Sequence, residues 1–458
     1  MTALLLSAWI ALASAPAPAP RPPFDVVGTL REYIKIDTSN PPGNELKAAE
    51  FLRAILAGEG IEAEIVEIAP GRANLVARLR GNGTRKALIL SHHMDVVHAD
   101  RAGWSADPFG AEIRDGYLYG RGALDMKTTG ILHLAALIRL KRERVPLDRD
   151  VIYIGTADEE VGAEGMSALI AKRPELFAGA AESLTEGDVI DARGGGGVRA
   201  WNVSVAEKAV LWLELTATGI AGHASTPPPA GTAVDALVGA LDRLRRHETP
   251  IVVLPEVARY FAALKDRFPG LAPEKLARLE SSLAEDPAFR AAFLGDGERA
   301  ARVRNTIAIT VLRGGPQTNV IPKTASAQVD CRLLPGQDPE AMIEEVRRAI
   351  DDPRIAIRTL QPVVKSTASA TSTPLFRAIE RVAAREAPGV PVVPTLLTSW
   401  TESALLRPLG IDAYGFDPLA LDERELALSH GDDERVSLAS VERGAAIVYA
   451  IVKEAASR

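Results

Sequence analysis

A histidine and an aspartate two residues apart, His93 and Asp95, follow an apolar run at 87–90 that predicts a strand. Residues at this spacing face the same side of an extended chain. Ligand sites of α/β sheets lie at the carboxyl ends of strands, and a metal-bound imidazole usually donates its second N–H to a carboxylate. His93 is therefore a candidate metal ligand, with Asp95 as its orienting partner. A purely structural histidine is the commoner case at a strand end, so this motif alone does not decide.

Further carboxylates follow an expected turn or the end of an expected strand. Asp125 follows a glycine-flanked turn and precedes an expected helix at 128–143, where it can cap the helix or bridge two cations. The apolar run 150–155 ends in consecutive acids that include Glu159 and Glu160. Their side chains diverge, so one can bind a metal while the other takes a proton from a metal-activated water. A solvated acidic turn is the alternative.

Glu186 and His430 complete the set of candidate ligands. Glu186 stands at the end of an expected strand, and His430 precedes the last expected helix. Either segment, taken alone, is as consistent with a surface loop. Together, two imidazoles and three carboxylates suit two cations that share a bridging carboxylate and a water. The five expected ligands are His93, Asp125, Glu160, Glu186 and His430.

The elements expected around these residues form two units. Strands alternate with helices over 24–207 and again over 365–458, which indicates βαβ units. The intervening residues 208–364 begin with a half-exposed strand and continue with helices and strands. We therefore expect an α/β fold, with a mixed-sheet catalytic domain that has helices on both faces and is interrupted by a smaller α+β domain.

Two features of the smaller domain are predicted in more detail. A helix from about Thr232 should bury one apolar stripe. The stripe consists of Val234, Leu237, Val238, Leu241 and Leu244. Residues 250–300 are expected to be a helical, polar-rich insertion with apolar clusters.

The N-terminal residues 1–23 differ from the rest of the chain. A short apolar run leads to a small-residue site and a Pro/Ala tract, which resembles a signal peptide and linker. No Lys or Arg precedes the run, and Pro16 follows the best cleavage point, so a disordered tail or a membrane tether is the alternative. We expect a periplasmic or secreted protein, and a cytoplasmic one if this segment is not a signal. No later segment reaches the ~20 apolar residues of a membrane span.

Composition excludes some classes of function. The net charge of −7 argues against non-specific nucleic-acid binding, because no basic surplus exists to neutralise phosphates. The single cysteine, Cys331, cannot form an intramolecular disulfide or a cysteine-based zinc site. Its strand-like surroundings predict a buried, inert thiol.

These motifs, in this order, resemble the dizinc metallopeptidase family of aminoacylase, acetylornithine deacetylase, succinyl-diaminopimelate desuccinylase and glutamate carboxypeptidase. The likeness extends from about Phe24 to the C-terminus and rests on His-x-Asp, Gly-Arg-Gly-x-x-Asp and Glu-Glu. The insertion at 250–300 and the His430-Gly-x-x-Glu434 motif are most similar to the carboxypeptidase S-like and secreted N-acyl amino acid hydrolase members. One departure is Glu402, which replaces the Asp of many members.

The resemblance implies two zinc ions per chain, with cobalt or manganese as alternatives, and roles for individual residues. One ion would be held by His93, Asp125 and Glu186, and the other by Asp125, Glu160 and His430. Glu159 would be the general base, and Asp95 would orient His93. The implied reaction is hydrolysis of an amide or peptide bond next to a free carboxylate. A non-catalytic metal or peptide binding protein on the same scaffold, or a mononuclear hydrolase, is the alternative.

The smaller domain is implied to be a lid through which two chains form a homodimer. His223 would reach the active site of the partner subunit and stabilise the oxyanion. Arg332 would pair with the substrate carboxylate, because a guanidinium binds a carboxylate bidentately. Asn305 or Asn319 would assist. The substrate would be a small peptide or an N-acyl amino acid, so carboxypeptidase, dipeptidase and N-acyl amino acid hydrolase activities all remain open.

Overall fold

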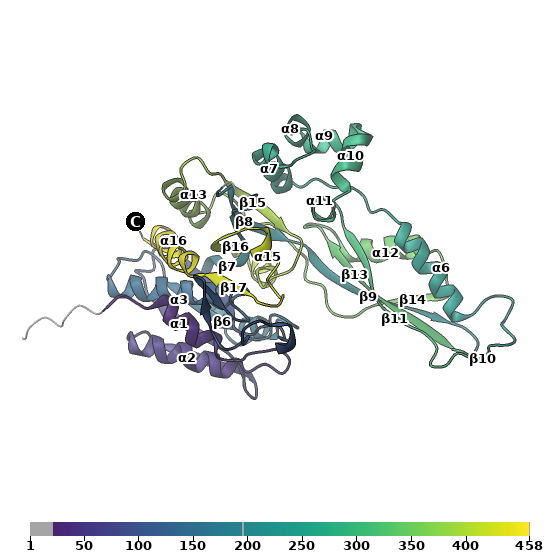
Figure 1. Ribbon diagram of the computed structural model, residues 1–458, viewed down its shortest axis with the longest axis horizontal. Coiled ribbons are helices and arrows are strands. Elements are labelled where there is room, and N and C mark those ends of the chain that lie inside the picture. Colours follow the sequence, from purple (N-terminus) through teal and green to yellow (C-terminus); the bar gives the residue numbers. More distant parts are fainter. Residues whose placement is uncertain (1–21, 195–196, 458) are drawn as a thin grey trace, which may run out of the picture.

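The computed structural model describes residues 22–194 and 197–457 of the chain. The part of the expected signal segment up to residue 21 lies outside the described residues. The described chain forms a large unit, which contains both chain ends, and an elongated small unit that extends away from it (Figure 1). Among the described residues, no helix combines the length and the hydropathy that a membrane span requires.

The large unit is built on an eight-stranded mixed sheet with the order β1-β2-β6-β3-β7-β16-β8-β15. β3 runs parallel to both of its neighbours, β6 and β7, so the carboxyl ends of these three strands meet at one edge. The strands are β1 (Ala63–Ala69), β2 (Arg72–Leu79), β3 (Ala87–His93), β6 (Val151–Thr156), β7 (Ala180–Asp191), β8 (Ala200–Glu207), β15 (Val392–Leu397) and β16 (Asp412–Leu421). A small sheet of β4 (Ile113–Arg114), β5 (Tyr117–Tyr119) and β17 (Arg435–Ser437) lies beside it.

Helices cover both faces of the large sheet. Leu88 and Leu90 of β3 pack into one apolar core, and the intervening Ile89 packs into another, as expected for a strand that is buried on both faces. The first core includes α1 (Val26–Ile34), α2 (Glu45–Gly58), α3 (Lys127–Arg142), α13 (Pro374–Glu386) and α16 (Leu438–Ala456). The second includes α4 (Glu164–Lys172), α5 (Pro174–Ala178) and α14 (Ser403–Leu406). This architecture confirms the predicted mixed α/β fold.

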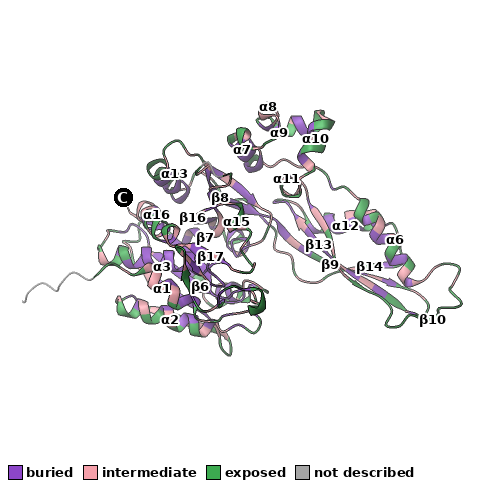
Figure 2. Cartoon of the chain, viewed as in Figure 1, coloured by how far each residue is buried: buried purple, intermediate pink, exposed green. Residues whose placement is uncertain are grey.

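The small unit is a four-stranded sheet of order β11-β13-β9-β14 with two helices packed on one face. Figure 2 shows buried residues concentrated in the sheets and exposed residues on the outer sides of the helices. Its elements are β9 (Ala209–Thr218), α6 (Ala233–Arg246), β11 (Thr306–Arg313), β13 (Thr324–Leu333), α12 (Pro339–Ile350) and β14 (Ile355–Thr359). At its far end, β10 (Gly222–His223) pairs with β12 (Val320–Ile321). Cys331 is fully buried, as predicted.

One residue of the predicted apolar stripe was assigned to the wrong face. Val238 on α6 is 60% exposed. Ala236 and Ala240, which the prediction passed over, are buried instead. At 100° per residue, the stripe centred on Leu237 and Leu241 leaves position 238 on its outer side.

The insertion at 250–300 is helical, as predicted, but it packs on the large sheet. Phe261 and Phe293 share an apolar cluster with Ala206 of β8 and with Val393 and Leu396 of β15. Its helices are α7 (Pro255–Ala263), α8 (Pro273–Leu276), α9 (Leu279–Glu285), α10 (Pro287–Leu294) and α11 (Gly297–Arg302). The domain limits of 207/208 and 364/365 stay a proposal.

Buried polar contacts surround the end of β8, where the chain passes from the large unit into the small unit. Glu207 Oε1 lies 2.7 Å from Arg407 Nη1, and Glu207 Oε2 accepts a 2.6 Å hydrogen bond from Thr401. The next residue, Lys208, donates from Nζ to the carbonyl oxygens of Ala301 (3.1 Å) and Arg304 (2.9 Å). Burial lowers the pKa of Lys208 to about 7. The contacts of Glu207 and Lys208 therefore bring the large sheet, the small unit and the insertion together at this point of the chain.

Candidate metal centre

The candidate ligands meet at the carboxyl edge of β3, β6 and β7. His93 is the last residue of β3 and pairs with Thr156, the last residue of β6, so the acids that follow β6 emerge beside it. Asp125 stands in the turn before α3, and His430 stands in the loop before β17. Parallel pairing of the central strands thus brings together residues from distant parts of the sequence.

Two groups of three residues have their ligand atoms within 4.8 Å of one another. In the first group, His93 Nε2 is 2.9 Å from Asp125 Oδ1 and 3.6 Å from Glu186 Oε2. In the second group, His430 Nε2 is 3.0 Å from Asp125 Oδ2 and 3.3 Å from Glu160 Oε1. Asp125 therefore presents one oxygen to each group, which is the arrangement of a bridging carboxylate.

The donor set fits two divalent cations. Imidazole nitrogens and carboxylate oxygens are the ligands that zinc and similar ions take in proteins. Glu160 Oε1, although near His430, is buried and has no hydrogen bond to the described residues. A buried carboxylate oxygen without a hydrogen bond is costly, and a cation placed between these residues would compensate it.

The protonation of these groups reflects their crowding. Burial alone would lower the pKa of His93, but the neighbouring carboxylates of Glu186 and Asp125 raise it well above its usual value. The neighbouring carboxylates of Asp125 and Glu160 raise the pKa of His430 to about 10. Burial raises the pKa of Glu186 to about 7. The cluster thus holds protons at the positions where cations would lie, as expected for competing metal and proton binding.

Glu159 is placed differently from the ligands. It belongs to neither ligand group. Burial, together with the charge of Glu186, raises the pKa of Glu159 well above its usual value. A carboxylate with a raised pKa beside a metal centre suits a general base, which works best when its pKa lies near the operating pH.

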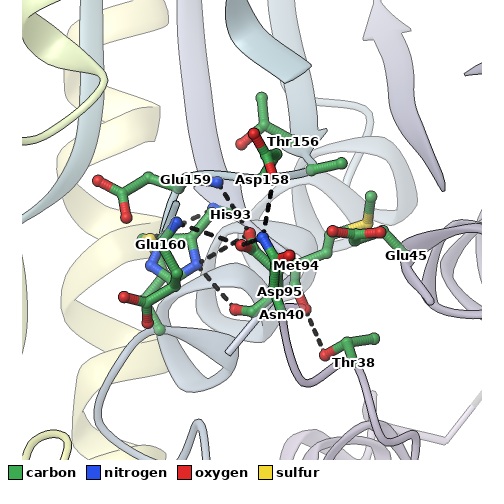
Figure 3. Close-up of polar contacts among 12 residues, drawn as sticks. Thr38, Asn40, Glu45, His93, Met94, Asp95, Thr156, Asp158, Glu159 and Glu160 are labelled. Atoms are coloured by element: carbon green, nitrogen blue, oxygen red, sulfur yellow. Dashed lines mark hydrogen bonds and ion pairs between the residues drawn. The ribbon is translucent and has the colours of Figure 1, made fainter. Parts of the chain in front are cut away.

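Asp95 supports the site in a way that the sequence only partly predicted. His93 Nδ1 donates a 2.9 Å hydrogen bond to the backbone oxygen of Asp95, whereas the nearest carboxylate oxygen is 3.6 Å away. The carboxylate instead accepts hydrogen bonds from the backbone N–H groups of Glu159 (3.1 Å) and Glu160 (3.2 Å) (Figure 3). Asp95 therefore positions the acidic loop as well as the histidine.

Sequence reasoning missed a buried polar network behind this loop. Asn40 Nδ2 donates to Asp95 Oδ2 at 2.9 Å and to Asp158 Oδ1 at 3.0 Å (Figure 3). Arg72 lies 2.9 Å from the same oxygen of Asp158 and also pairs with buried Glu45. Asp158 belongs to the acidic run, which was a usable signal. Nothing in the local sequence distinguishes Asn40 or Arg72 from ordinary polar residues.

A second support links the turn of Asp125 to the loop of His430. Arg121 donates from Nη1 to Glu434 Oε2 at 2.6 Å and from Nη2 to the backbone oxygen of His430 at 3.2 Å. Glu434 Oε1 accepts the backbone N–H groups of Leu124 (2.6 Å) and Asp125 (3.2 Å). The loop that supplies Asp125 and the loop that supplies His430 are thus held together.

The expected substrate residues of the small unit are not all at the site. Arg332 lines a cavity together with Glu159 and Glu160. His223 is exposed on β10, which pairs with β12 far from the large sheet (Figure 1). The backbone N–H of the next residue, Ala224, donates a hydrogen bond to the backbone oxygen of Asn319.

Asn305 has other partners. Its Oδ1 accepts the backbone N–H of Leu334 at 2.8 Å, and the side chain is buried inside the small unit. That Asn305 binds substrate stays a prediction, and its Oδ1 is already engaged within the small unit.

Comparison with known proteins places the chain among metal-dependent hydrolases of amide and peptide bonds. It belongs to the family described as peptidase family M20/M25/M40, whose model matches residues 89–454. This confirms the family resemblance inferred from the motifs.

Relatives and solved structures agree with this assignment. The chain is 29% identical to human aminoacylase-1 over 439 residues, which covers 94% of this chain and 95% of the relative. It is 32% identical to the N-fatty-acyl-amino acid synthase/hydrolase of Xenopus tropicalis over 366 residues, which covers 77% of this chain and 69% of the relative. Its fold is similar to an M20 family metallo-carboxypeptidase from Sulfolobus solfataricus, with a TM-score of 0.72 at 20% identity over 94% of this chain and 99% of the other.

Proposed function

We propose that this chain hydrolyses N-acyl amino acids or small peptides at the amide bond next to a free carboxylate, and that two zinc ions reside in its site. The observation that carries the proposal is the position of Asp125 between the two histidines, with one oxygen 2.9 Å from His93 Nε2 and the other 3.0 Å from His430 Nε2. A shared carboxylate of this kind serves a pair of ions rather than one. Zinc is proposed from the N/O ligand set, and cobalt or manganese would fit the same donors.

Different residues of the chain then have different roles in catalysis. When bound, the cations polarise the scissile carbonyl and lower the pKa of water. Glu159 takes a proton from that water and gives it to the leaving amine, which is general base and general acid catalysis by one carboxylate. Asp95 keeps Glu159 in place through the backbone N–H of that residue. Retention of Glu159 favours an enzyme over a non-catalytic binding protein.

The small unit is proposed to act as a lid. Arg332, which lines the cavity beside Glu159, pairs with the substrate carboxylate. Closure of the lid would exclude water and complete the site.

We further propose that two chains form a homodimer through their small units. β11 is an edge strand of the small sheet, as is β14, and exposed strand edges favour pairing. Leu312 on β11 is 65% exposed, and Val238 on α6 is 60% exposed. His223, which lies away from the metal ligands of its own chain, would then serve the partner's site and stabilise the oxyanion. Asn319 lies beside it and would assist.

Export remains a prediction from the N-terminal sequence. Residues 1–21 lie outside the described part of the chain. N-terminal sequencing of the protein recovered from a periplasmic or culture fraction would check the proposed cleavage.

A substrate screen tests the proposed function. Metal-free protein is reloaded with zinc, cobalt or manganese and mixed with N-acetyl amino acids, dipeptides and longer peptides, and the released amine is measured. We expect hydrolysis only of compounds with a free carboxylate next to the scissile amide, and only after metal is restored. The methyl esters of the same compounds, in which the free carboxylate is blocked and the amide is kept, serve as controls. Equal cleavage of the amide in these esters, or no hydrolysis in any metal-loaded sample, would overturn the proposal.

A further inference from the structure

An open cavity of about 500 Å³ lies between the large unit and the small unit, beside Glu159 and Glu160. Most of its remaining wall is apolar and comes from four separate segments of the chain. The apolar lining residues are Val161, Ala163, Val210, Trp212, Pro362, Val364, Trp400 and Leu405. A cavity of this size accommodates a small organic group next to the reacting centre.

Two apolar side chains of this wall are unusually exposed. Trp212 is 36% exposed on the outward face of β9, and Val161, which directly follows Glu160, is 56% exposed. Covering such surface with an apolar group gains roughly 25 cal/mol per Å². Large exposed apolar side chains gathered in a cleft indicate a binding site rather than ordinary surface.

Trp400 is held in the wall by the residues that follow it. Thr401 donates to Glu207 Oε2 at 2.6 Å, and Glu402 Oε2 accepts a 2.8 Å hydrogen bond from Thr156. Both Thr401 and Glu402 are buried. Thr156 is the last residue of β6, three positions before Glu159, so the loop of Trp400 is fixed to the strand that carries the proposed base.

A single cation, Arg332, lies among the described residues that line the cavity. On β13 it stands opposite Val210 of β9, and its ion-pair partner Asp330 stands opposite Trp212. Alternate residues of a strand share one face, so the guanidinium and the Trp212 indole project from the same face of the small sheet. A ligand that pairs its carboxylate with Arg332 therefore brings its adjacent side chain to Trp212.

We propose that Trp212 and Trp400 determine substrate specificity by binding a large apolar side chain on the amino acid whose carboxylate pairs with Arg332. The inference rests on the proposed function and refines it. The preferred substrates are then N-acyl derivatives or dipeptides that end in an aromatic or branched apolar residue such as phenylalanine or leucine. The acyl group lies on the opposite side of the scissile amide, outside this cavity.

The test compares N-acetylphenylalanine with N-acetylalanine as substrates of the metal-loaded protein. We expect a wild-type kcat/KM at least about 10-fold higher for the phenylalanine compound, because apolar contacts of this size discriminate about 10- to 200-fold. In Trp212→Ala and Trp400→Ala, that ratio should fall about 10-fold or more, while kcat/KM for N-acetylalanine stays within about 3-fold of wild type. Trp400→Phe should restore most of the ratio. Leu409→Ala, at a 46% exposed leucine that does not line the cavity, is the control.

Other results would show whether the specificity assignment, the substrate orientation or the proposed function itself is wrong. A ratio unchanged in both Trp→Ala variants, or equal losses on the two substrates, would overturn the specificity assignment while leaving the hydrolase intact. A second series keeps alanine as the amino acid and lengthens the acyl chain from acetyl to decanoyl. Selective loss of the long-acyl compounds in the Trp→Ala variants would place the acyl group in this cavity and overturn the proposed orientation. Absence of wild-type hydrolysis of every compound would count against the proposed function itself.

Discussion

Arg121 Nη1 lies 2.6 Å from Glu434 Oε2 in a fully buried ion pair, although the two residues belong to opposite parts of the chain. Glu434 also accepts the backbone N–H groups of Leu124 and Asp125. The pair therefore fixes the turn that carries Asp125 against the loop that carries His430. Supports of this kind matter because cation binding requires ligand atoms at defined positions.

Replacing Glu434 with Gln should weaken metal binding without removing any ligand. The neutral side chain loses the charged pair with Arg121 and part of its hold on the backbone of Asp125. Loss of such a support typically costs about 10- to 100-fold in metal affinity. Competition with a chromophoric chelator measures the change. Glu442→Gln, at an exposed glutamate on α16, is the control, and equal affinities in Glu434→Gln and wild type would contradict the assigned role.

Glu402 should make the metal-free protein less stable as pH rises. Burial raises the pKa of Glu402 from 4.5 to about 8. Between these values the folded state binds a proton that the unfolded state has released, so the free energy of unfolding falls as pH rises from about 4.5 through about 8. Glu402→Gln mimics the neutral acid and keeps an oxygen that accepts from Thr156.

Denaturant unfolding at pH 5 and pH 8 checks this expectation. The loss of stability between the two pH values should be smaller in Glu402→Gln than in wild type, by on the order of 2–4 kcal/mol. Glu380→Gln, at an exposed glutamate on α13, should behave as wild type. Parallel pH profiles for Glu402→Gln and wild type would show that the carboxyl group is not protonated in the folded state.

The ion pair of Glu207 and Arg407 should stabilise the large unit next to the point where the chain passes into the small unit. Both side chains are at most 3% exposed, so Arg407→Leu leaves a buried carboxylate without its cation. Breaking a buried pair in this way costs about 3–5 kcal/mol. The double variant Glu207→Gln/Arg407→Leu should recover part of that loss, because no charge stays buried. A loss below about 1 kcal/mol in the single variant, measured by urea unfolding, would show that solvent reaches the pair.

Co-expression of two inactive variants tests whether His223 serves the partner subunit. His223→Ala lacks the proposed oxyanion group, and Glu159→Gln lacks the proposed base. In a mixed dimer, the subunit that retains Glu159 receives His223 of the partner subunit, so one of its two sites is complete. Random pairing makes half of the dimers mixed, and activity should return to about a quarter of wild type. Activity equal to the average of the two parents would show that His223 acts within its own chain or not at all.

The large sheet and the grouping of the candidate ligands were predictable from the sequence because both depend on local patterns. Buried strands such as β6 are continuous apolar runs, and the acids that follow them are conspicuous in the sequence. The order of the motifs then matched a known family, which single motifs such as His93 and Asp95 did not establish.

Features that depend on tertiary packing were not predictable. The burial of Asn305 results from contacts with Leu334 and Met342, which no local pattern encodes. Asn40 joins Asp95 to Asp158 only because the N-terminal segment lies against the ends of β3 and β6. The insertion packs on β15, a strand about a hundred residues further along the chain. In each case the determining partner is distant in sequence.

Metal content and turnover of Glu159→Gln, each measured beside wild type, separate metal binding from the proposed base catalysis. We expect two metal ions per chain in both proteins, because Glu159 belongs to neither ligand group. Turnover should fall by at least about 10²- to 10⁴-fold in the variant, the usual contribution of a general base. One ion per chain at full occupancy in wild type, or wild-type turnover in Glu159→Gln, would rule out the proposed two-metal site with Glu159 as its base.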